Sequence, residues 1–543
     1  MKKKIVKKTL IIGVTIIIAL CFLGITNKSN ATEKYEDWEY KINDDQTTIT
    51  LTNFSGAETN LVIPSKIGNY TVTGIYGNGI TNNTYSVFEH YNSIETVKVP
   101  STINEIGSYA FMGCKNLKSI ELSEGLEKIG NCAFYNCEKL QQINIPSTVK
   151  IIDCNSEFNP FDTCYELTEI NVNNNNINYS SLDGVLFNKD KSILISYPGA
   201  KKDTKYTVPL SVRQIYAIAF EKNDSLKTVN IQSNVTKMQG NGWIESLGGY
   251  EFSIQDCKNL QEIIVSEDNQ AFYSENGIIY NKDKTKILCY PYGKKDTYFC
   301  IPETVSKIKN MAFKNEFLEK ININSKIDDA RFLTEIKKLK IIEVNDSNTN
   351  FISEKGVLLS KDKNELICYP RGKEDKEYEV NNNVKKIGKN AFKESNIEKI
   401  ILPDTITDIE EEAFYGCKKL KEIGISKNLT RIRKRVFYNC TGLKEVTIPK
   451  LVVEIEDEAF YNCCNLNILQ FEENSKIKKI GNKAFNNCKN IEVVNIPEGT
   501  EQINASFRYC KKIMNINIPS TLLNLPTYTF DFRRRYSTNY NSQ

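Results

Sequence analysis

A phenylalanine recurs along the chain at a nearly fixed interval, and this period limits the possible folds more than any other feature. The spacing of 23 residues is seen in two runs, Phe88 to Phe111 to Phe134 and Phe414 to Phe437 to Phe460. Three residues after most of these phenylalanines comes Cys, and Leu or Ile follows three residues later. A fixed period in the low twenties is typical of a solenoid, in which each unit stacks on the next.

Each unit combines a strand pattern with a second apolar segment. The Leu-x-x-Ile-x-Ile portion alternates as a short strand does, and a Pro after it ends the strand. The Ile-Gly-x-x-Ala-Phe portion places one small and one large side chain against the same core. About five buried side chains, at roughly 1.5–3 kcal/mol each, do not offset the backbone entropy of such a unit. We therefore expect the units to fold only as a stacked array.

This pattern resembles the BspA-type bacterial branch of the leucine-rich repeat superfamily. The motif L-x-x-I-x-I-P-x-x-(V/L)-x-x-I-G-x-x-A-F-x-x-C runs from about Ile94 to Phe530. The first members of its fourteen strand cores are Ile94, Leu117, Leu140, Leu167, Leu226, Leu260, Leu318, Leu339, Ile397, Leu420, Leu443, Leu466, Ile491 and Ile513. The resemblance implies a right-handed, curved repeat solenoid with a β-strand and a short helical or irregular segment in each unit. It also implies display outside a bacterial cell, for adhesion or protein binding.

Three intervals between strand cores are 59, 58 and 58 residues long, where 23 would be expected. Each contains two β-prone runs joined by a polar turn, such as Asn188-Lys189-Asp190-Lys191, and this pattern predicts a β-hairpin. The inserts lie near 179–212, 272–305 and 351–384. Such a hairpin either extends the stack or projects from it, and we favour extension.

The two ends of the chain differ from the repeats. Residues 1–31 have a lysine-rich start and an apolar run from Leu10 to Ile25, which predict a signal peptide; a retained anchor is the alternative. We expect an N-terminal β cap at 32–87, the solenoid at 88–530 and a disordered tail at 531–543. The expected location is secreted or on the cell surface, with no membrane span after signal removal. Wall attachment and release both stay open.

Nine of the sixteen cysteines occupy one column of the repeat. They are Cys114, Cys137, Cys164, Cys257, Cys417, Cys440, Cys463, Cys488 and Cys510. Asn223 and Asn315 stand in the same column, which fits a buried turn position. Stacked members would lie within disulfide reach, but their Cβ vectors would run parallel. We predict packing residues, with disulfides or metal binding as the alternative.

Little in the sequence favours catalysis. The single histidine, His90, falls in an expected loop, which argues against multi-His metal sites and triads. Paired carboxylates, which glycosidases require, occur at Glu410 to Glu412 and at Asp328-Asp329, where the repeat predicts a solvated face. We expect no enzyme activity, no cofactor and no metal, and a net charge of +4 argues against nucleic-acid binding.

Two basic clusters also need an interpretation. They contain Arg431, Arg433, Lys434 and Arg435, and then Arg533 to Arg535 in the tail. Such clusters bind anionic polysaccharide or membrane surfaces in some proteins. The period places the first cluster on the outside of the repeat, so we favour a solvated face.

The residue between the two inward positions of each strand is the candidate ligand-binding position. It is asparagine in six of the fourteen units: Asn144, Asn171, Asn230, Asn322, Asn495 and Asn517. Amide side chains donate and accept hydrogen bonds, which suits an extracellular protein or glycan partner. The competing interpretation is a strand face that is simply hydrated.

The sequence therefore predicts a noncatalytic binding protein that engages protein or glycan ligands. Two alternatives remain. One is an exported polysaccharide-degrading enzyme on a β-solenoid, and the other is a structural surface protein that associates with itself. The sequence leaves the ligand and the oligomeric state open.

Overall fold

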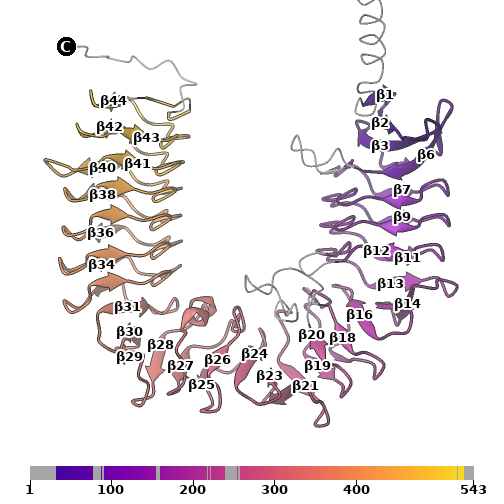
Figure 1. Cartoon of the computed structure of the whole chain (residues 1–543), viewed down its shortest axis with the longest axis horizontal. Helices are drawn as coiled ribbons and strands as arrows, with labels where there is room; N and C mark the ends of the chain where they lie inside the picture. The colour runs from indigo at the N-terminus through magenta and orange to yellow at the C-terminus, as the bar shows by residue number, and fades with distance from the viewer. Residues whose placement is uncertain are drawn as a thin grey trace, which may run out of the picture. The chain divides into compact units, whose positions relative to one another are not determined.

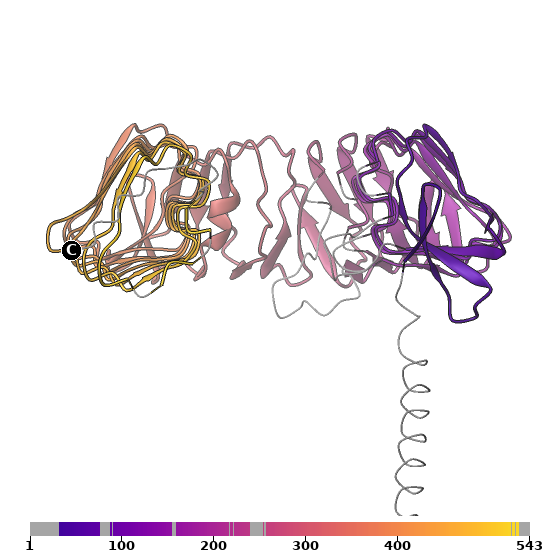
Figure 2. The ribbon, with the colours of Figure 1, turned by 90° about the horizontal axis from the view of Figure 1, so that it is seen from above.

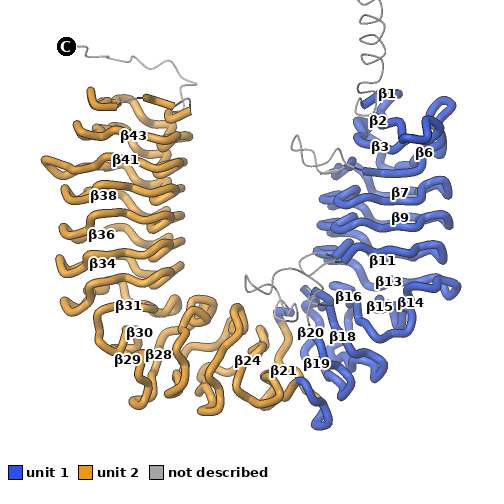
Figure 3. The backbone as a smooth tube through the Cα atoms, in the orientation of Figure 1, with its two compact units in different colours: residues 1–258, 266–271 blue, residues 259–265, 272–543 orange. Residues whose placement is uncertain are grey.

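The computed structural model describes residues 32–76, 87–88, 91–154, 159–216, 218–220, 222–238, 254, 257–522, 524–526 and 528–530. The predicted signal peptide, His90 and the predicted tail lie outside the described residues. The chain divides into two compact units, one of residues 1–258 with 266–271 and one of residues 259–265 with 272–543 (Figure 3). Each unit is described by itself.

Within each unit the chain winds into stacked coils, and strands from successive coils form parallel ladders (Figure 1). In the first unit, β11 (Gln142–Ile145) pairs in parallel with β13 (Glu169–Val172), one coil further along. The two-residue strand β10 (Lys128–Ile129) pairs in parallel with β8 (Glu105–Ile106) and β12 (Ile151–Ile152). Each coil thus contributes one strand from the Leu-x-x-Ile segment and one from the Ile-Gly segment.

The first unit begins with an antiparallel β1–β2–β3 meander, after which β3 pairs in parallel with β6. Its other strands are β1 (Glu33–Tyr35), β2 (Trp38–Ile42), β3 (Thr48–Phe54), β4 (Asn60–Val62), β5 (Lys66–Ile67), β6 (Tyr70–Ile75), β7 (Thr96–Lys98), β9 (Ser119–Glu121), β14 (Tyr179–Leu182), β15 (Val185–Asn188), β16 (Ile193–Ser196), β17 (Lys205–Thr207), β18 (Gln214–Ile215), β19 (Thr228–Ile231) and β20 (Lys237–Met238).

The second unit has the same construction. Its strands of the Leu-x-x-Ile type are β21 (Glu262–Val265), β25 (Tyr298–Cys300), β27 (Lys320–Ile323), β28 (Ile341–Val344), β32 (Glu377–Glu379), β34 (Lys399–Ile401), β36 (Glu422–Gly424), β38 (Glu445–Ile448), β40 (Ile468–Phe471), β42 (Val493–Asn495) and β44 (Asn515–Asn517). Its other strands are β22 (Phe272–Glu275), β23 (Ile278–Asn281), β24 (Lys286–Cys289), β26 (Lys307–Ile308), β29 (Phe351–Glu354), β30 (Val357–Ser360), β31 (Glu365–Cys368), β33 (Lys386–Ile387), β35 (Asp408–Ile409), β37 (Arg431–Ile432), β39 (Glu454–Ile455), β41 (Lys479–Ile480) and β43 (Gln502–Ile503).

The segment around each Ala-Phe pair is irregular and not helical. Its backbone amides bond from one coil to the next, as in Phe111 N–H to the Ala133 carbonyl at 2.8 Å and Gly113 N–H to the Tyr135 carbonyl at 2.8 Å. Among the described residues, the one helical element longer than a single residue is the 3-10 helix η4 (Arg331–Glu335). The predicted solenoid is therefore confirmed, and its non-strand segments are extended turns.

Stacked phenylalanines form the centre of the core. In the second unit, the column from Phe392 through Phe414, Phe437, Phe460, Phe485 and Phe507 to Phe530 has ring centroids 5.0 to 5.4 Å apart. Viewed along the stack in Figure 2, the coils of this region superpose closely. This regular packing explains why the sequence period is so strict.

Every cysteine of the repeat column is a free thiol and donates its S–H to the carbonyl of the phenylalanine one coil earlier. The nine distances from Sγ to the carbonyl oxygen lie between 3.0 and 3.2 Å. Burial raises the pKa of Cys114 to about 12. The interpretation as packing residues is confirmed, and the thiol adds a hydrogen bond that the sequence did not reveal.

The inserts have one more strand than predicted. In the first insert, β14, β15 and β16 form a three-stranded antiparallel meander, and β16 then pairs in parallel with β18 of the following coil. The other two inserts repeat this arrangement with β22 to β24 and β29 to β31. The predicted hairpin is present as β15–β16, β14 adds a third strand to it, and the insert extends the stack.

Three strand cores were also missed. β17 pairs in parallel with β19, β25 with β27, and β32 with β34, so each long interval contains a further coil after its insert. These strands lack the leading Leu of the motif. An aromatic residue, such as Phe299 of β25, stands at the inward position that Ile occupies elsewhere.

Coils that follow an insert use a different residue at the cysteine position. Asn315 donates its amide to the carbonyls of Pro291, Tyr292 and Lys294 at 2.8 to 3.1 Å. Its Oδ1 accepts the backbone N–H groups of Phe317 and Leu318 at 2.7 Å. Asn223 binds the chain in the same manner after the first insert, and Ser395 takes the position after the third.

Candidate functional site

All six predicted asparagines lie on the outward side of the Leu-x-x-Ile ladders, but they do not form one site. In the first unit Asn144 stands opposite Asn171, and in the second unit Asn495 stands opposite Asn517. Asn230 stands opposite Thr207, and Asn322 stands between Cys300 and Glu343. The structure thus forms two asparagine pairs and leaves two asparagines among other side chains.

Hydrogen bonds between coils hold several of these amides in place. Asn517 Nδ2 donates to Asn495 Oδ1 at 2.6 Å, and Asn230 Nδ2 donates to Thr207 Oγ1 at 2.9 Å. Because the Asn495 oxygen is the acceptor in this pair, its N–H2 group is not used by it. The hydrogen bond limits the rotation of both side chains.

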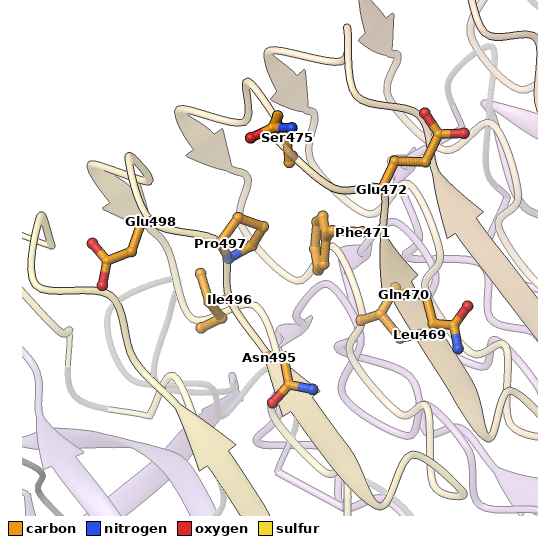
Figure 4. A pocket seen from close by; sticks show the side chains of 10 residues that line it. Leu469, Gln470, Phe471, Glu472, Ser475, Asn495, Ile496, Pro497 and Glu498 are labelled. Carbon is orange, nitrogen blue, oxygen red and sulfur yellow. The ribbon is translucent and has the colours of Figure 1, made fainter.

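The larger groove of the strand face lies where a ladder is interrupted. β38–β40 and β42–β44 are separate two-stranded sheets, and a groove of about 660 Å³ lies between β40 and β42. Its lining residues are Leu469, Gln470, Phe471, Glu472, Asn474, Ser475, Asn495, Ile496, Pro497 and Glu498. In Figure 4, Phe471 and Pro497 lie toward the middle, with Ser475 above them and Asn495 below.

The local sequence explains this groove. The interval from Phe460 to Phe485 is 25 residues, and Glu472 replaces the Pro that usually ends the strand. The longer turn contains Asn474 in a left-handed conformation with φ of 59°. The unusual interval was visible in the sequence, but its consequence for the surface was not predicted.

A smaller groove of about 290 Å³ occurs in the first unit at another interruption, between the sheets β4–β7–β9 and β11–β13. It is lined by Leu122, Glu124, Asn144, Ile145, Pro146, Asn171, Val172 and Asn173. Glu124 accepts hydrogen bonds from the Ser147 backbone and hydroxyl and from Asn173. Three of the six predicted asparagines therefore line a groove: Asn144, Asn171 and Asn495.

The carboxylate and arginine clusters form ion pairs between coils. Arg433 Nε lies 3.0 Å from Asp408 Oδ1, and Arg435 Nε lies 2.6 Å from Glu458 Oε2. Glu411 pairs with Lys389 at 3.2 Å. Hydrogen bonds and charge from Glu458 raise the pKa of Arg435, and burial only partly opposes this shift. These side chains form a neutralised, striped surface, which agrees with the solvated-face interpretation.

Neither a metal centre nor a membrane helix is found in the described part of the chain. There, no group of three or more His, Cys, Asp or Glu side chains is arranged to hold an ion. No helix in that part combines the length and the apolar composition needed to span a bilayer.

Comparison with known proteins gives the family. The pattern of the BspA type leucine rich repeat region matches the chain in six copies, over residues 81–193, 196–291, 373–476 and 407–537. No curated protein sequence matches the chain.

Several solved structures are similar to this chain. A leucine rich cell surface protein from Faecalibacterium prausnitzii is 21% identical, with 90% of this chain and 95% of that chain covered and a TM-score of 0.32. A leucine-rich repeat protein from Bacteroides ovatus is 20% identical, with coverage of 90% and 89% and a TM-score of 0.27. The pneumococcal vaccine antigen PcpA is 17% identical, with coverage of 91% and 93% and a TM-score of 0.26.

Proposed function

The chain belongs to the BspA-type leucine-rich repeat family, and from this premise we propose that it is an exported, noncatalytic protein that binds extracellular protein or glycan ligands. Proteins of this family are typically bacterial surface proteins with roles in protein interaction. The proposal adds that the ligand contacts the outward side of the Leu-x-x-Ile ladders, and that binding serves adhesion to a host, a matrix or a neighbouring cell.

One observation carries the proposal: outward asparagines of successive coils stand side by side on the strand face, and three of them line grooves. Asn495 accepts a hydrogen bond from Asn517 at 2.6 Å, and Asn144 stands in register beside Asn171. A rigid polar surface loses little side-chain entropy on binding, so more of the contact energy remains as affinity. Within each unit, the hydrogen-bonded parallel ladders make the strand face rigid.

The chemistry of the described residues favours binding over catalysis. The three carboxylates of the Glu410 to Glu412 run are paired with cations of neighbouring coils: Glu410 with Lys386 at 3.0 Å, Glu411 with Lys389 at 3.2 Å and Glu412 with Arg435 at 3.5 Å. Glycosidases need a pair of carboxylates that flank the scissile bond, and these three are held in ion pairs instead. Family members are also generally noncatalytic.

The decisive experiment is an unbiased array of glycans and host proteins probed with residues 32–543. We expect at least one specific ligand, and we expect its binding to fall at least tenfold in a variant with all six predicted asparagines changed to Ala. Turnover of a polysaccharide panel by the purified chain would contradict the noncatalytic proposal. If the sixfold variant binds the ligand as tightly as the original chain, the strand face is not the contact surface.

A further inference from the structure

The larger groove between β40 and β42 has a chemistry more specific than the rest of the strand face. Its lining includes two carboxylates, Glu472 and Glu498, together with amides and a hydroxyl. None of the described residues that line it is basic. An anionic ligand would therefore meet like charge with no compensating cation in the groove.

Both carboxylates are held by neighbouring coils through hydrogen bonds. Glu472 Oε2 accepts the Lys450 backbone N–H at 2.9 Å. Glu498 accepts the Ser520 backbone N–H and hydroxyl, each at 3.0 Å. Each carboxylate bonds to a coil outside the pair that forms the groove, and the two lie at its opposite edges (Figure 4). An ionised carboxylate has about four acceptor positions, so each retains acceptor capacity there.

The amides of Gln470, Asn474 and Asn495 supply donors beside these acceptors. A hydroxyl group donates and accepts at once, so a ligand with vicinal hydroxyls satisfies amides and carboxylates together. An ammonium group only donates, and it would leave the amide N–H groups without an acceptor. The mixed lining thus favours hydroxyl-rich ligands over lysine-like ones.

Two apolar surfaces complete the groove. The Phe471 ring is partly exposed, although its counterpart one coil earlier, Ile448, is fully buried. An aromatic ring face carries partial negative charge, which attracts the C–H face of a pyranose. Pro497 gives a second flat surface in the same groove (Figure 4). The volume of about 660 Å³ lies inside the range of roughly 300–1,000 Å³ of small-molecule sites.

We propose that this groove is a binding site for a short, neutral oligosaccharide, with Phe471 and Asn495 as its main contacts. This inference rests on the proposed function and narrows its ligand class. The smaller groove shares a carboxylate, a proline and outward asparagines with this lining, but none of its described lining residues is aromatic, so the proposal is made for the larger groove alone.

The test uses residues 32–543 and isothermal titration calorimetry with defined probes. The neutral probes are cellotetraose, maltotetraose, laminaritetraose and galactotetraose, and the charged probes are tetragalacturonate and tetralysine. We expect at least one neutral tetraose to bind more tightly than both charged probes. Failure of all four neutral probes at 10 mM, or tighter binding of a charged probe, overturns the inference.

Substitutions locate the site. Phe471→Ala and Asn495→Ala should each weaken binding of the neutral probe at least tenfold. Thr447→Ala is the matched control, because Thr447 has the same outward strand position in the same unit but lines neither groove. If the control variant loses as much affinity for the neutral probe, the binding site is not the groove between β40 and β42. Asn495 is exposed, so its variant tests the site even if Phe471→Ala lowers stability.

The inference and the broader proposal fail in different ways. If the array identifies a ligand whose binding depends on the six asparagines, while the tetraoses do not bind, the strand face remains the contact surface. The neutral oligosaccharide is then the wrong ligand class. If neither experiment detects a ligand, both proposals are wrong.

Discussion

The second unit contains two stretches that build the same coil in different ways. Residues 386–530 contain no insert, and in them phenylalanines stack and cysteines bond to the preceding coil. Residues 272–384 contain two inserts, and there tyrosine replaces the stacked phenylalanine at Tyr290 and Tyr369. Each tyrosine hydroxyl donates to an aspartate six residues later, at 3.1 Å for Asp296 and 3.0 Å for Asp375.

The comparison shows that one structural requirement has two solutions. A coil must satisfy carbonyl groups of its predecessor at the turn before the strand. After a Phe coil, one thiol bonds one carbonyl. After a Tyr-Pro coil, Asn315 satisfies three carbonyls and two amides. After the first two inserts the next coil therefore has Asn at this position, whereas Ser395 follows the third.

The largest expected effect is the loss of a stacked ring. Phe437→Ala should lower the free energy of unfolding by about 3–5 kcal/mol, because a fully buried ring leaves a cavity between Phe414 and Phe460. Hydrogen exchange measured by mass spectrometry should show faster exchange in the coils on both sides. Faster exchange confined to one coil would contradict a cooperative stack.

Substitutions of Asn315 and Cys440, which occupy the same repeat position in the two kinds of coil, test the comparison directly. Asn315→Ala should cost about 2–4 kcal/mol, because buried backbone groups lose their partners. Cys440→Ala should cost only about 1 kcal/mol, because it removes a single weak hydrogen bond and little volume. Chemical denaturation of both variants gives the values. If Asn315→Cys is as stable as the original chain, the two solutions are interchangeable and the comparison fails.

The hydrogen bond from Tyr369 to Asp375 should make the free energy of unfolding depend on pH. Burial acts to raise the pKa of Asp375, but hydrogen bonds from Lys373 and Tyr369 outweigh it and lower that pKa. The stabilisation is therefore complete above the unfolded pKa of about 3.9 and is lost as the pH falls through the lower folded value. Tyr369→Phe should cost about 1 kcal/mol at neutral pH and weaken this acid dependence. If the free energy of unfolding of Tyr369→Phe falls at acid pH as steeply as that of the original chain, the Tyr369–Asp375 hydrogen bond does not cause the pH dependence.

The smallest effect concerns the turns inside the inserts. Lys355 and Gly356 both have positive φ, at 50° and 80°, as a type I′ turn requires. The first two inserts have Asp183-Gly184 and Asn276-Gly277 at this turn, and Asn and Asp tolerate this conformation better than Lys. Lys355→Asn should therefore stabilise the chain by up to about 1 kcal/mol in thermal unfolding. Asn276→Lys is the reciprocal control and should destabilise.

The period and the apolar alternation were sufficient to predict the solenoid and all fourteen strand cores. β17, β25 and β32 were missed because their inward residues include aromatics without a leading Leu, so the motif is not visible there. The outward position of the six asparagines followed from strand alternation. That three of them line grooves, whereas Asn230, Asn322 and Asn517 do not, did not follow, because it depends on where ladders separate, as at Glu472 to Lys476.

The striped ion pairs have a consequence for how such a chain can gain or lose repeats. Lys389, Glu411 and Lys434 stand in successive coils, followed by Asp457, so the sign alternates along the stack. Deleting one coil, for example residues 431–453, would place Asp408 and Glu410 beside Glu454 and Glu456. Deleting two coils would restore opposite signs. At these positions an even change in the number of coils keeps opposite signs adjacent, whereas an odd change brings like charges together, at a cost of about 0–1 kcal/mol for each exposed pair.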